Sequence, residues 1–449
     1  MRQQYRLESI TLRDVGVFEH THFDFPQIKS EEKDAEKAEI HIFTGPNGCG
    51  KSTLLYALAA VFQPDPNDGG RLVRKRYRGE NSSIRFIFYQ EQGVFGVQNM
   101  ASPDSVQQIY NTDSFYYAVT NGVRSVLWRN VSYFNHSQEY STKKFDFAAF
   151  AYSGNRDMQS SFNVSAIQNI TNSPFESSLS FGQTVRPQVL TQWIANNRTQ
   201  AARARADGEV LEAEHYDLAL LRISQFIRNI CSLDVSFQLK RLPLEVIINM
   251  DGLKVTFDAL PEGLKSIICW ISDLALRLES IPWQENRDIF SQPIILFLDE
   301  VDIHLHPKWQ RRILPAIQKL LPNAQVFVST HSPFVVGSVE DAFVYRLPDP
   351  QRTVCRDPAS AEVITPTPSA AGKSYQLILD EVFGIEEQFD VETEALLEKF
   401  YQLKKAYLSN PQDDSQLVAL AAELSSKGSE VATIVSMELR QITRLVKKG

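Results

Sequence analysis

The phosphate-binding loop pattern G-x-x-x-x-G-K-[ST] is fitted at every fixed position by one run of this chain: Gly45, Pro46, Asn47, Gly48, Cys49, Gly50, Lys51, Ser52 and Thr53. Its glycines let backbone N–H groups turn inward around a polyphosphate, and the start of a following helix adds positive potential there. Lys51 can reach the β- and γ-phosphates, and Ser52 can ligate Mg²⁺. The run therefore predicts a site for ATP and Mg²⁺ rather than a plain glycine-rich turn.

A pair of carboxylates far along the chain supplies the second half of such a site. Residues 294–298 form an uninterrupted apolar run, as buried parallel strands do, and Asp299 and Glu300 follow it. Asp299 can hold the metal ion or its water, and Glu300 can polarise the attacking water. The alternative is a strand that ends in a solvated acidic turn. The complete phosphate loop elsewhere in the chain favours the catalytic interpretation.

The elements around these residues follow from the hydrophobic pattern. A strand-like run at 40–43 precedes the phosphate loop and a helix-like run at 54–62 follows it, which is the context that the motif needs. Another strand-like run, 325–331, ends at His331, which can sense the γ-phosphate and orient the water. Gln90, at the end of a further strand-like run, is a candidate for contacting the water or Mg²⁺, by role and order only.

A glycine turn before a helical stretch forms a third candidate anion site. Leu260-Pro261-Glu262-Gly263-Leu264-Lys265-Ser266 leads into residues 267–278, whose apolar side chains recur at helical spacing. A glycine turn that feeds a helix N-terminus can hold an anion. The alternative is an ordinary capped helix of the core.

In this order, the phosphate loop, the glycine turn with its helix, the Asp-Glu strand and the histidine resemble the ATP-binding-cassette (ABC) ATPases. The resemblance implies a dimer whose two heads sandwich two ATP molecules, with Gly263 and the Leu264 amide acting on the ATP held by the partner. The family usually has a serine where Pro261 stands. Because proline offers neither a hydroxyl nor an N–H, the resemblance implies weaker activation in trans, or activation carried by Ser266 or Lys265.

Three segments relate the chain to the RecF/SMC/OLD-like group of that family. Residues 300–307 are similar to its E-x-x-x-H-L-H-P loop, and residues 329–333 and 7–25 resemble the same group. Residues 374–385 resemble, more loosely, the tail of Septu-type and retron-associated antiphage ATPases. The implied class is therefore the ATPase subunit of an antiphage system of the Septu, retron-associated or PARIS-like kind. The long separation between residues 53 and 260 argues against a compact transporter cassette.

The expected fold class is α/β. It comprises an ABC-ATPase head, with a mixed sheet around the phosphate loop and an antiparallel β subdomain, plus a helical insertion and a C-terminal helical domain. No heptad pattern persists in the insertion, so no long coiled coil is expected. The two parts of the head are expected at residues 1–186 and 233–348, with the helical insertion at 187–232 between them. A Pro-, Thr- and Ser-rich linker follows at 349–371, and the helical domain occupies 372–449.

Composition excludes several classes of protein. Of its 449 residues, 43% are hydrophobic and 22% are charged. These fractions are typical of soluble globular proteins. Its net charge of −8 indicates neither a nucleic-acid coat nor a membrane-surface protein. The four scattered cysteines have no C-x-x-C spacing and indicate neither a zinc site nor a disulfide framework. Without a signal-like or membrane-spanning run, a cytoplasmic location and no membrane partner are expected.

These observations lead to two hypotheses from different classes. The first is a slow ATPase that forms a homodimer or higher homo-oligomer and controls a separate nuclease effector of HNH or Toprim type, because no nuclease motif is visible in the chain. The second is a RecF-like DNA-repair ATPase that binds nucleic acid directly, through the basic run 71–78. A solvated loop is the ordinary explanation for such a run. Salt-dependent DNA binding that weakens when Arg74, Lys75 and Arg76 are neutralised would support the second.

Overall fold

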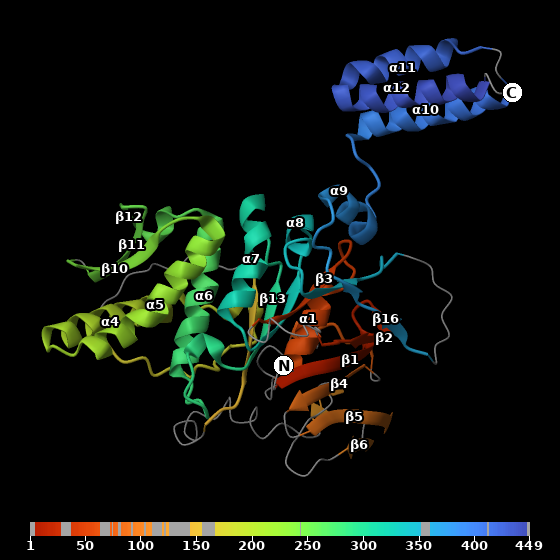
Figure 1. Ribbon diagram of the computed structural model, residues 1–449. Helices are drawn as coiled ribbons and strands as arrows, with labels where there is room; N and C mark the ends of the chain where they lie inside the picture. The colour runs from red at the N-terminus through yellow and green to blue at the C-terminus, as the bar shows by residue number, and fades with distance from the viewer. Residues whose placement is uncertain are drawn as a thin grey trace. The chain divides into compact units, whose positions relative to one another are not determined.

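The computed structural model divides the chain into two compact units, Met1–Ile378 and Leu379–Gly449, which are both drawn in Figure 1. In the part of the chain that the structure describes, no helix is long and apolar enough to cross a membrane. The described residues are 5–27, 37–62, 72–73, 75–79, 82–90, 93–102, 105–109, 119–120, 123–124, 144–154, 167–242, 244–351, 360–410 and 413–446.

The first unit is built around a six-stranded sheet in the order β17-β15-β3-β14-β13-β9. Its strands run parallel except for β17, and their bounds are β3 (Glu39–Thr44), β9 (Ala148–Ser153), β13 (Ile294–Asp299), β14 (Ala324–Ser329), β15 (Ala342–Arg346) and β17 (Thr367–Pro368). Every residue of β3, β13 and β14 is buried, which explains the continuous apolar run of β13. The register pairs Leu298 with Val328 and Ser329 with Phe43, so the carboxyl ends of β13, β14 and β3 meet at one edge.

Helices pack around this sheet and around one another. The helix α1 (Lys51–Ala60) packs against β13 and β14, and α7 (Pro307–Leu320) packs against the short α8 (Pro333–Val336), which in turn contacts α9 (Tyr375–Ile378). The helix α6 (Glu262–Ser280) is buried along most of its length, including two charged residues, Asp273 and Arg277. Short 3₁₀ turns occur at η2 (Phe181–Gln183), η3 (Phe257–Ala259) and η4 (Ile289–Ser291).

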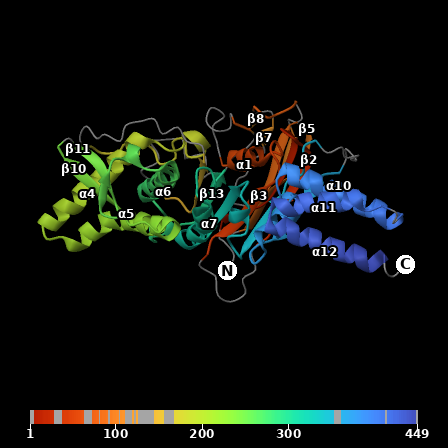
Figure 2. The ribbon, with the colours of Figure 1, turned by 90° about the horizontal axis from the view of Figure 1, so that it is seen from above.

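A helical hairpin extends the first unit on the side of α6. It consists of α4 (Pro187–Ala206) and α5 (Val210–Cys231), which contact each other and α6. Figure 2 shows this hairpin beside a three-stranded antiparallel sheet, β10 (Val235–Arg241), β11 (Leu244–Met250) and β12 (Leu253–Val255). Buried apolar residues hold the two helices together. Asp217 of α5 also accepts hydrogen bonds from Arg198 and Arg205 of α4.

A second, mostly antiparallel sheet contains the N-terminal hairpin. Its main order is β16-β2-β1-β4-β5-β6, with β7 and β8 at the side. A buried polar cluster joins it to the first sheet. Arg6 Nη2 donates to Glu39 Oε1 at 2.6 Å, and the Gln325 side chain forms hydrogen bonds with the backbone of Leu7 and with the Glu39 carboxylate. The strand bounds are β1 (Tyr5–Val15), β2 (Phe18–Asp24), β4 (Ser83–Gln90), β5 (Gly93–Ser102), β6 (Ser105–Ile109), β7 (Val119–Thr120), β8 (Val123–Arg124) and β16 (Glu362–Ile364).

The second unit is a bundle of three helices that follows a π-helical turn, η5 (Leu379–Phe383). The helices are α10 (Val391–Ser409), α11 (Ser415–Lys427) and α12 (Ser429–Val446), and Figure 1 shows them side by side. Asp390 begins α10 by accepting hydrogen bonds from the N–H groups of Glu392 and Thr393. The bundle has its own core, formed by Leu397, Phe400, Leu417, Leu420, Ala421, Leu424, Val431, Val435 and Ile442.

This architecture confirms the predicted α/β class. A mixed sheet surrounds the phosphate loop, an antiparallel sheet adjoins it, a helical hairpin is inserted and a helical region closes the chain. The exact domain boundaries stay a prediction.

Candidate nucleotide site

The loop between β3 and α1 has a backbone conformation that its glycines permit. Gly48 and Gly50 have φ of 79° and 98°, values that residues with a side chain rarely adopt. Gly50 also lies against the β1–β2 turn, because a Cβ there would sit 2.6 Å from Val17 Cγ2. Leu54 N donates to Gly50 O at 2.8 Å, so α1 starts directly after the loop. Strand, loop and helix are thus arranged as an anion site at a helix start requires.

The Lys51 ammonium is held inside this loop. Its Nζ donates to the carbonyl oxygens of Gly45 and Pro46, each at 3.0 Å, and lies 3.6 Å from Cys49 Sγ. Only 6% of the residue is exposed, so the charge has little water around it and would interact strongly with an anion in the loop. Burial raises the pKa of the Cys49 thiol, which therefore stays protonated beside the lysine at neutral pH.

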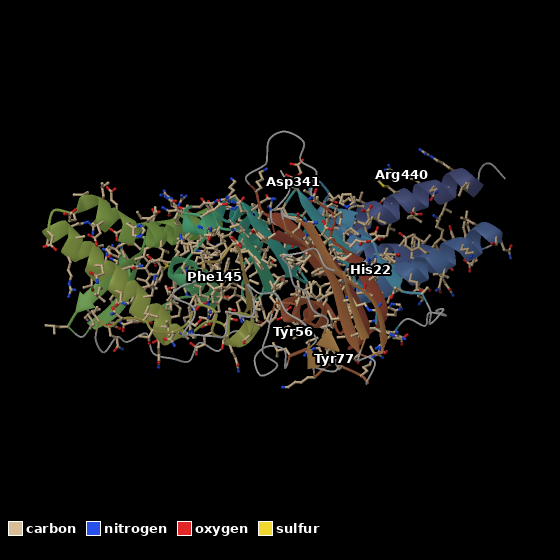
Figure 3. All side chains as sticks on the ribbon, turned by 90° about the horizontal axis from the view of Figure 1, so that it is seen from below. His22, Tyr56, Tyr77, Phe145, Asp341 and Arg440 are labelled. Carbon is tan, nitrogen blue, oxygen red and sulfur yellow. The ribbon has the colours of Figure 1, made fainter. Side chains whose placement is uncertain are left out.

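Asp299 is the last residue of β13, and its carboxylate accepts hydrogen bonds from three hydroxyl groups. Ser52 Oγ and Ser329 Oγ donate to its Oδ1 at 3.1 and 2.6 Å, and the hydroxyl of Tyr56, labelled in Figure 3, donates to Oδ2 at 3.5 Å. Asp299 is buried, and burial raises the pKa of its carboxyl; hydrogen bonds from Ser329 and Ser52 oppose that rise. The phosphate loop and the Asp-Glu strand therefore meet at one carboxylate.

The oxygen atoms around Asp299 suit Mg²⁺. This ion prefers oxygen ligands and keeps several waters, and the Ser52 hydroxyl lies 3.1 Å from the Asp299 carboxylate. A cation there would offset the cost of burying the carboxylate charge. Among the described residues, no group of three or more His, Cys, Asp and Glu side chains could hold a metal ion. A Mg²⁺ site completed by phosphate oxygens and water therefore fits better than an all-protein cage.

Glu300 directly follows β13 and has a left-handed backbone, with φ of 52°. Its N–H donates to Ser329 Oγ at 2.7 Å. Burial raises the pKa of its carboxyl, and the neighbouring charges of Asp299 and Asp302 add to the rise. A carboxylate whose pKa moves toward neutrality is a better proton acceptor, as a general base must be.

His331 lies just beyond β14, on the same edge of the sheet. Thr330 N donates to Phe43 O at 3.1 Å, which ties this strand end to the strand before the phosphate loop. Partial loss of hydration lowers the pKa of His331, and the charge of Lys51 adds to the lowering. The ring is therefore neutral at neutral pH and has one nitrogen that accepts and one that donates hydrogen bonds.

The glycine turn at the start of α6 packs on the loop that follows Glu300. A Cβ on Gly263 would lie 2.5 Å from His304 O and 3.3 Å from Leu305 Cδ2. Leu264 is completely buried, and its N–H donates to Pro261 O at 3.0 Å. The structure thus places Gly263 and Leu264 in a close contact within their own chain, and their action on a partner's ATP stays a prediction.

Some predicted residues fall where side chains are not described. Gln90 is the last residue of β4, but its side chain lies outside the described part of the chain, so its contact with water or Mg²⁺ stays a prediction. In the basic run, Arg71 and Arg74 lie outside the described residues. Arg76 is described, and its Nε donates to Thr53 Oγ1 at 3.1 Å. Part of the basic run therefore contacts the helix of the phosphate loop.

Other residues shape the site although no role is predicted for them from the sequence. Tyr56 lies under the Arg76 guanidinium, whose central carbon is 4.6 Å from the ring centre. Burial and the Asp299 charge raise the pKa of Tyr56 to about 12, so its hydroxyl remains a donor. Ser329 stands two residues before His331, and Gly154 follows β9. No periodicity marks these residues, because their roles depend on contacts between strands.

Comparisons with known proteins agree on the kind of domain. The family model described as "AAA domain, putative AbiEii toxin, Type IV TA system" matches residues 40–337. A second AAA-domain model matches residues 5–63. Together these matches include the phosphate loop, the Asp-Glu strand and His331.

Three curated relatives resemble parts of the chain. "Retron Ec83 probable ATPase" of Escherichia coli is 32% identical over 117 residues, which cover 26% of this chain and 21% of the relative. "Retron Vc95 probable ATPase" of Vibrio cholerae serotype O1 biovar El Tor is 34% identical over 118 residues, or 26% and 22%. "Septu protein PtuA" of Bacillus thuringiensis is 34% identical over 122 residues, or 24% and 31%. The chain thus spans less than a third of the length of these relatives.

Two solved structures match most of the chain at low sequence identity. The SMC head domain from Thermotoga maritima is 13% identical, with a TM-score of 0.39, over 81% of this chain and 99% of that one. A structure of the recombination mediator protein RecF, from the RecFOR pathway, is 11% identical, with a TM-score of 0.37, over 81% and 99%.

Proposed function

Because this chain belongs to the AAA-domain family described as "AAA domain, putative AbiEii toxin, Type IV TA system", we propose that it binds and hydrolyses ATP as a subunit of an antiphage defence complex. The observation that carries the ATPase proposal is the hydrogen bond from Ser52 to Asp299, which joins the phosphate loop to the Asp-Glu strand. The defence role is supported by relatives that are named as retron ATPases and as a Septu protein.

In the proposed reaction, each part of the site has one task. Lys51 and the N–H groups of the loop bind the β- and γ-phosphates. Ser52 and Asp299 would hold Mg²⁺, which would supply positive charge to the phosphate oxygens. Glu300 accepts a proton from the attacking water, and His331 orients that water against the γ-phosphate. The raised pKa of Glu300 and the lowered pKa of His331 suit these roles.

The proposal extends to assembly. Two heads would sandwich two ATP molecules, and the turn at Gly263 and Leu264 would act on the partner's ATP. A separate nuclease effector, of HNH or Toprim type, would be held while ATP is intact. Loss of bound ATP would change the spacing of the heads and release or activate the effector, because a ligand shifts a two-state equilibrium by its different affinity for the two states.

The catalytic assignment is tested by Glu300→Gln. The amide keeps the size of the side chain but cannot accept the proton, so turnover of ATP should fall by about 10²-fold or more, while ATP binding measured by equilibrium dialysis stays near that of the wild type. The matched control is Glu340→Gln, an exposed glutamate in the same unit, which should keep full turnover. Undiminished hydrolysis in Glu300→Gln would contradict the assignment.

A further inference from the structure

The turn at Glu300 is held from both sides by neighbouring strands. On the side of β14, Ser329 Oγ accepts a hydrogen bond from Glu300 N at 2.7 Å, and Ser329 O accepts one from Val301 N at 3.3 Å. On the side of β9, Gly154 N donates to Asp299 O at 2.7 Å. A Cβ on Gly154 would lie only 2.1 Å from Glu300 O. The peptide groups around Glu300 are therefore fixed by two residues outside its own strand.

The Ser329 hydroxyl donates one hydrogen bond and accepts another at this point. Its single proton goes to Asp299 Oδ1 at 2.6 Å, because an ionised carboxylate can only accept. Its oxygen accepts from Glu300 N at the same time. Ser329 is completely buried, so water does not replace either bond. One hydroxyl thus links the carboxylate proposed to hold the metal ion with the backbone of the proposed base.

The backbone of Glu300 needs such support. A φ of 52° is uncommon for a residue with a side chain, and such conformations persist where the surroundings hold them in place. Without Ser329, the Glu300 N–H would lose its partner. With a side chain at position 154, the Glu300 carbonyl would have to move.

We propose that Ser329 and Gly154 are positioning residues for ATP hydrolysis. Ser329 fixes the spacing between the Asp299 carboxylate and Glu300, and Gly154 leaves the room that the left-handed turn at Glu300 requires. The inference rests on the proposed ATPase function and gives a role to two residues whose contacts the sequence motifs do not predict.

The first test compares Ser329→Ala with Ser329→Thr. Displacement of reacting groups by about 1 Å can cost about 10²-fold in rate, so Ser329→Ala should lower kcat by about that factor and leave ATP affinity near the wild-type value. Ser329→Thr keeps the hydroxyl and should recover most of kcat.

The second test compares Gly154→Ala with Gly79→Ala. Gly154 does not have a positive φ, so alanine there meets only steric conflicts, with Glu300 O at 2.1 Å and with Ile303 Cγ2 at 2.5 Å. Gly79 also lacks a positive φ and has open space around its Cβ position. We expect Gly154→Ala to lose kcat with ATP affinity retained and Gly79→Ala to behave as the wild type.

The wild type and Glu300→Gln separate the two levels of the proposal. If the wild type shows no ATP turnover, or Glu300→Gln turns over equally fast, the proposed function fails. If both behave as expected but Ser329→Ala and Gly154→Ala keep the wild-type kcat, only the positioning inference is overturned. Loss of ATP binding in both variants would assign Ser329 and Gly154 a purely structural role and would also overturn it.

Discussion

At the scale of single residues, function and stability oppose each other at Asp299. Burial raises the pKa of this carboxyl in the folded protein above its value in the unfolded chain. Below the unfolded pKa, the group is protonated in both states and costs nothing. As the pH rises through the window up to the folded pKa, the unfolded chain ionises first and the folded state loses stability. That loss persists at neutral pH when no cation is bound.

Asp299→Asn should therefore make the nucleotide-free protein more stable at pH 7 while abolishing Mg²⁺-dependent ATP turnover. The amide oxygen can still accept from Ser52 and Ser329. Each kcal/mol recovered corresponds to a rise in Tm of a few degrees, and the difference from the wild type should shrink below about pH 4. Calorimetry across pH measures both effects, with the exposed Asp258→Asn as control. A lower Tm for Asp299→Asn at pH 7 would show that the buried charge is already compensated.

The sequence predicts the charged core of the site but not its support. The phosphate loop, Asp299, Glu300 and His331 stand out because their spacing is local or because each ends an apolar strand. The structure brings Ser52 and Asp299 within hydrogen-bond distance. Ser329 and Gly154 cannot be found in this way, since their contacts depend on the register of β14 and β9 with β13. A serine in a buried strand has no pattern that names its partner.

At the scale of elements, α6 is anchored by a buried ion pair. Arg277 Nε donates to Asp273 Oδ2 at 2.6 Å, and the Tyr152 hydroxyl donates to the same oxygen at 3.0 Å. The other guanidinium nitrogens donate to the carbonyl oxygens of Pro174, Glu176 and Thr184. These bonds connect α6 with β9 and with the segment that includes η2. Because the pair is fully desolvated, removing one partner would leave the other charge buried without compensation.

Arg277→Met should therefore lower the free energy of unfolding by about 3–5 kcal/mol, since it leaves the Asp273 carboxylate buried without its cation. The double variant Asp273→Asn with Arg277→Met removes both charges and should recover a large part of that loss. Urea denaturation of the three proteins measures the difference. If the double variant is less stable than Arg277→Met alone, the uncompensated charge is not the reason for the destabilisation.

The element pattern is predicted unevenly. A continuous apolar run identifies β13, and strand-like runs identify β3 and β14, all of which are buried on both faces. Helical spacing identifies α6 and the helices of the C-terminal bundle. The sheet order is not predicted from these runs, since β14 lies between β3 and β13 although it follows both in the sequence. That order is decided by long-range pairing, which local patterns do not contain.

At the scale of the whole molecule, the chain combines a nucleotide-binding unit with a separate helical bundle. The bundle has a core of its own, centred on Phe400 and Leu424, both completely buried. The phosphate loop, the Asp-Glu strand and His331 all belong to the first unit. We expect the nucleotide to bind the first unit and its binding to change how the chain assembles with its partners.

The central claim, that ATP controls the assembly of this chain, is tested most directly by the native mass of the purified Glu300→Gln variant in Mg²⁺-ATP and in Mg²⁺-ADP, with and without the product of the neighbouring gene. With hydrolysis blocked, we predict a dimer or larger homo-oligomer in ATP that binds the product of the neighbouring gene, and dissociation or altered composition in ADP. One unchanged mass in both nucleotides, with no binding of the neighbouring product, would contradict the account.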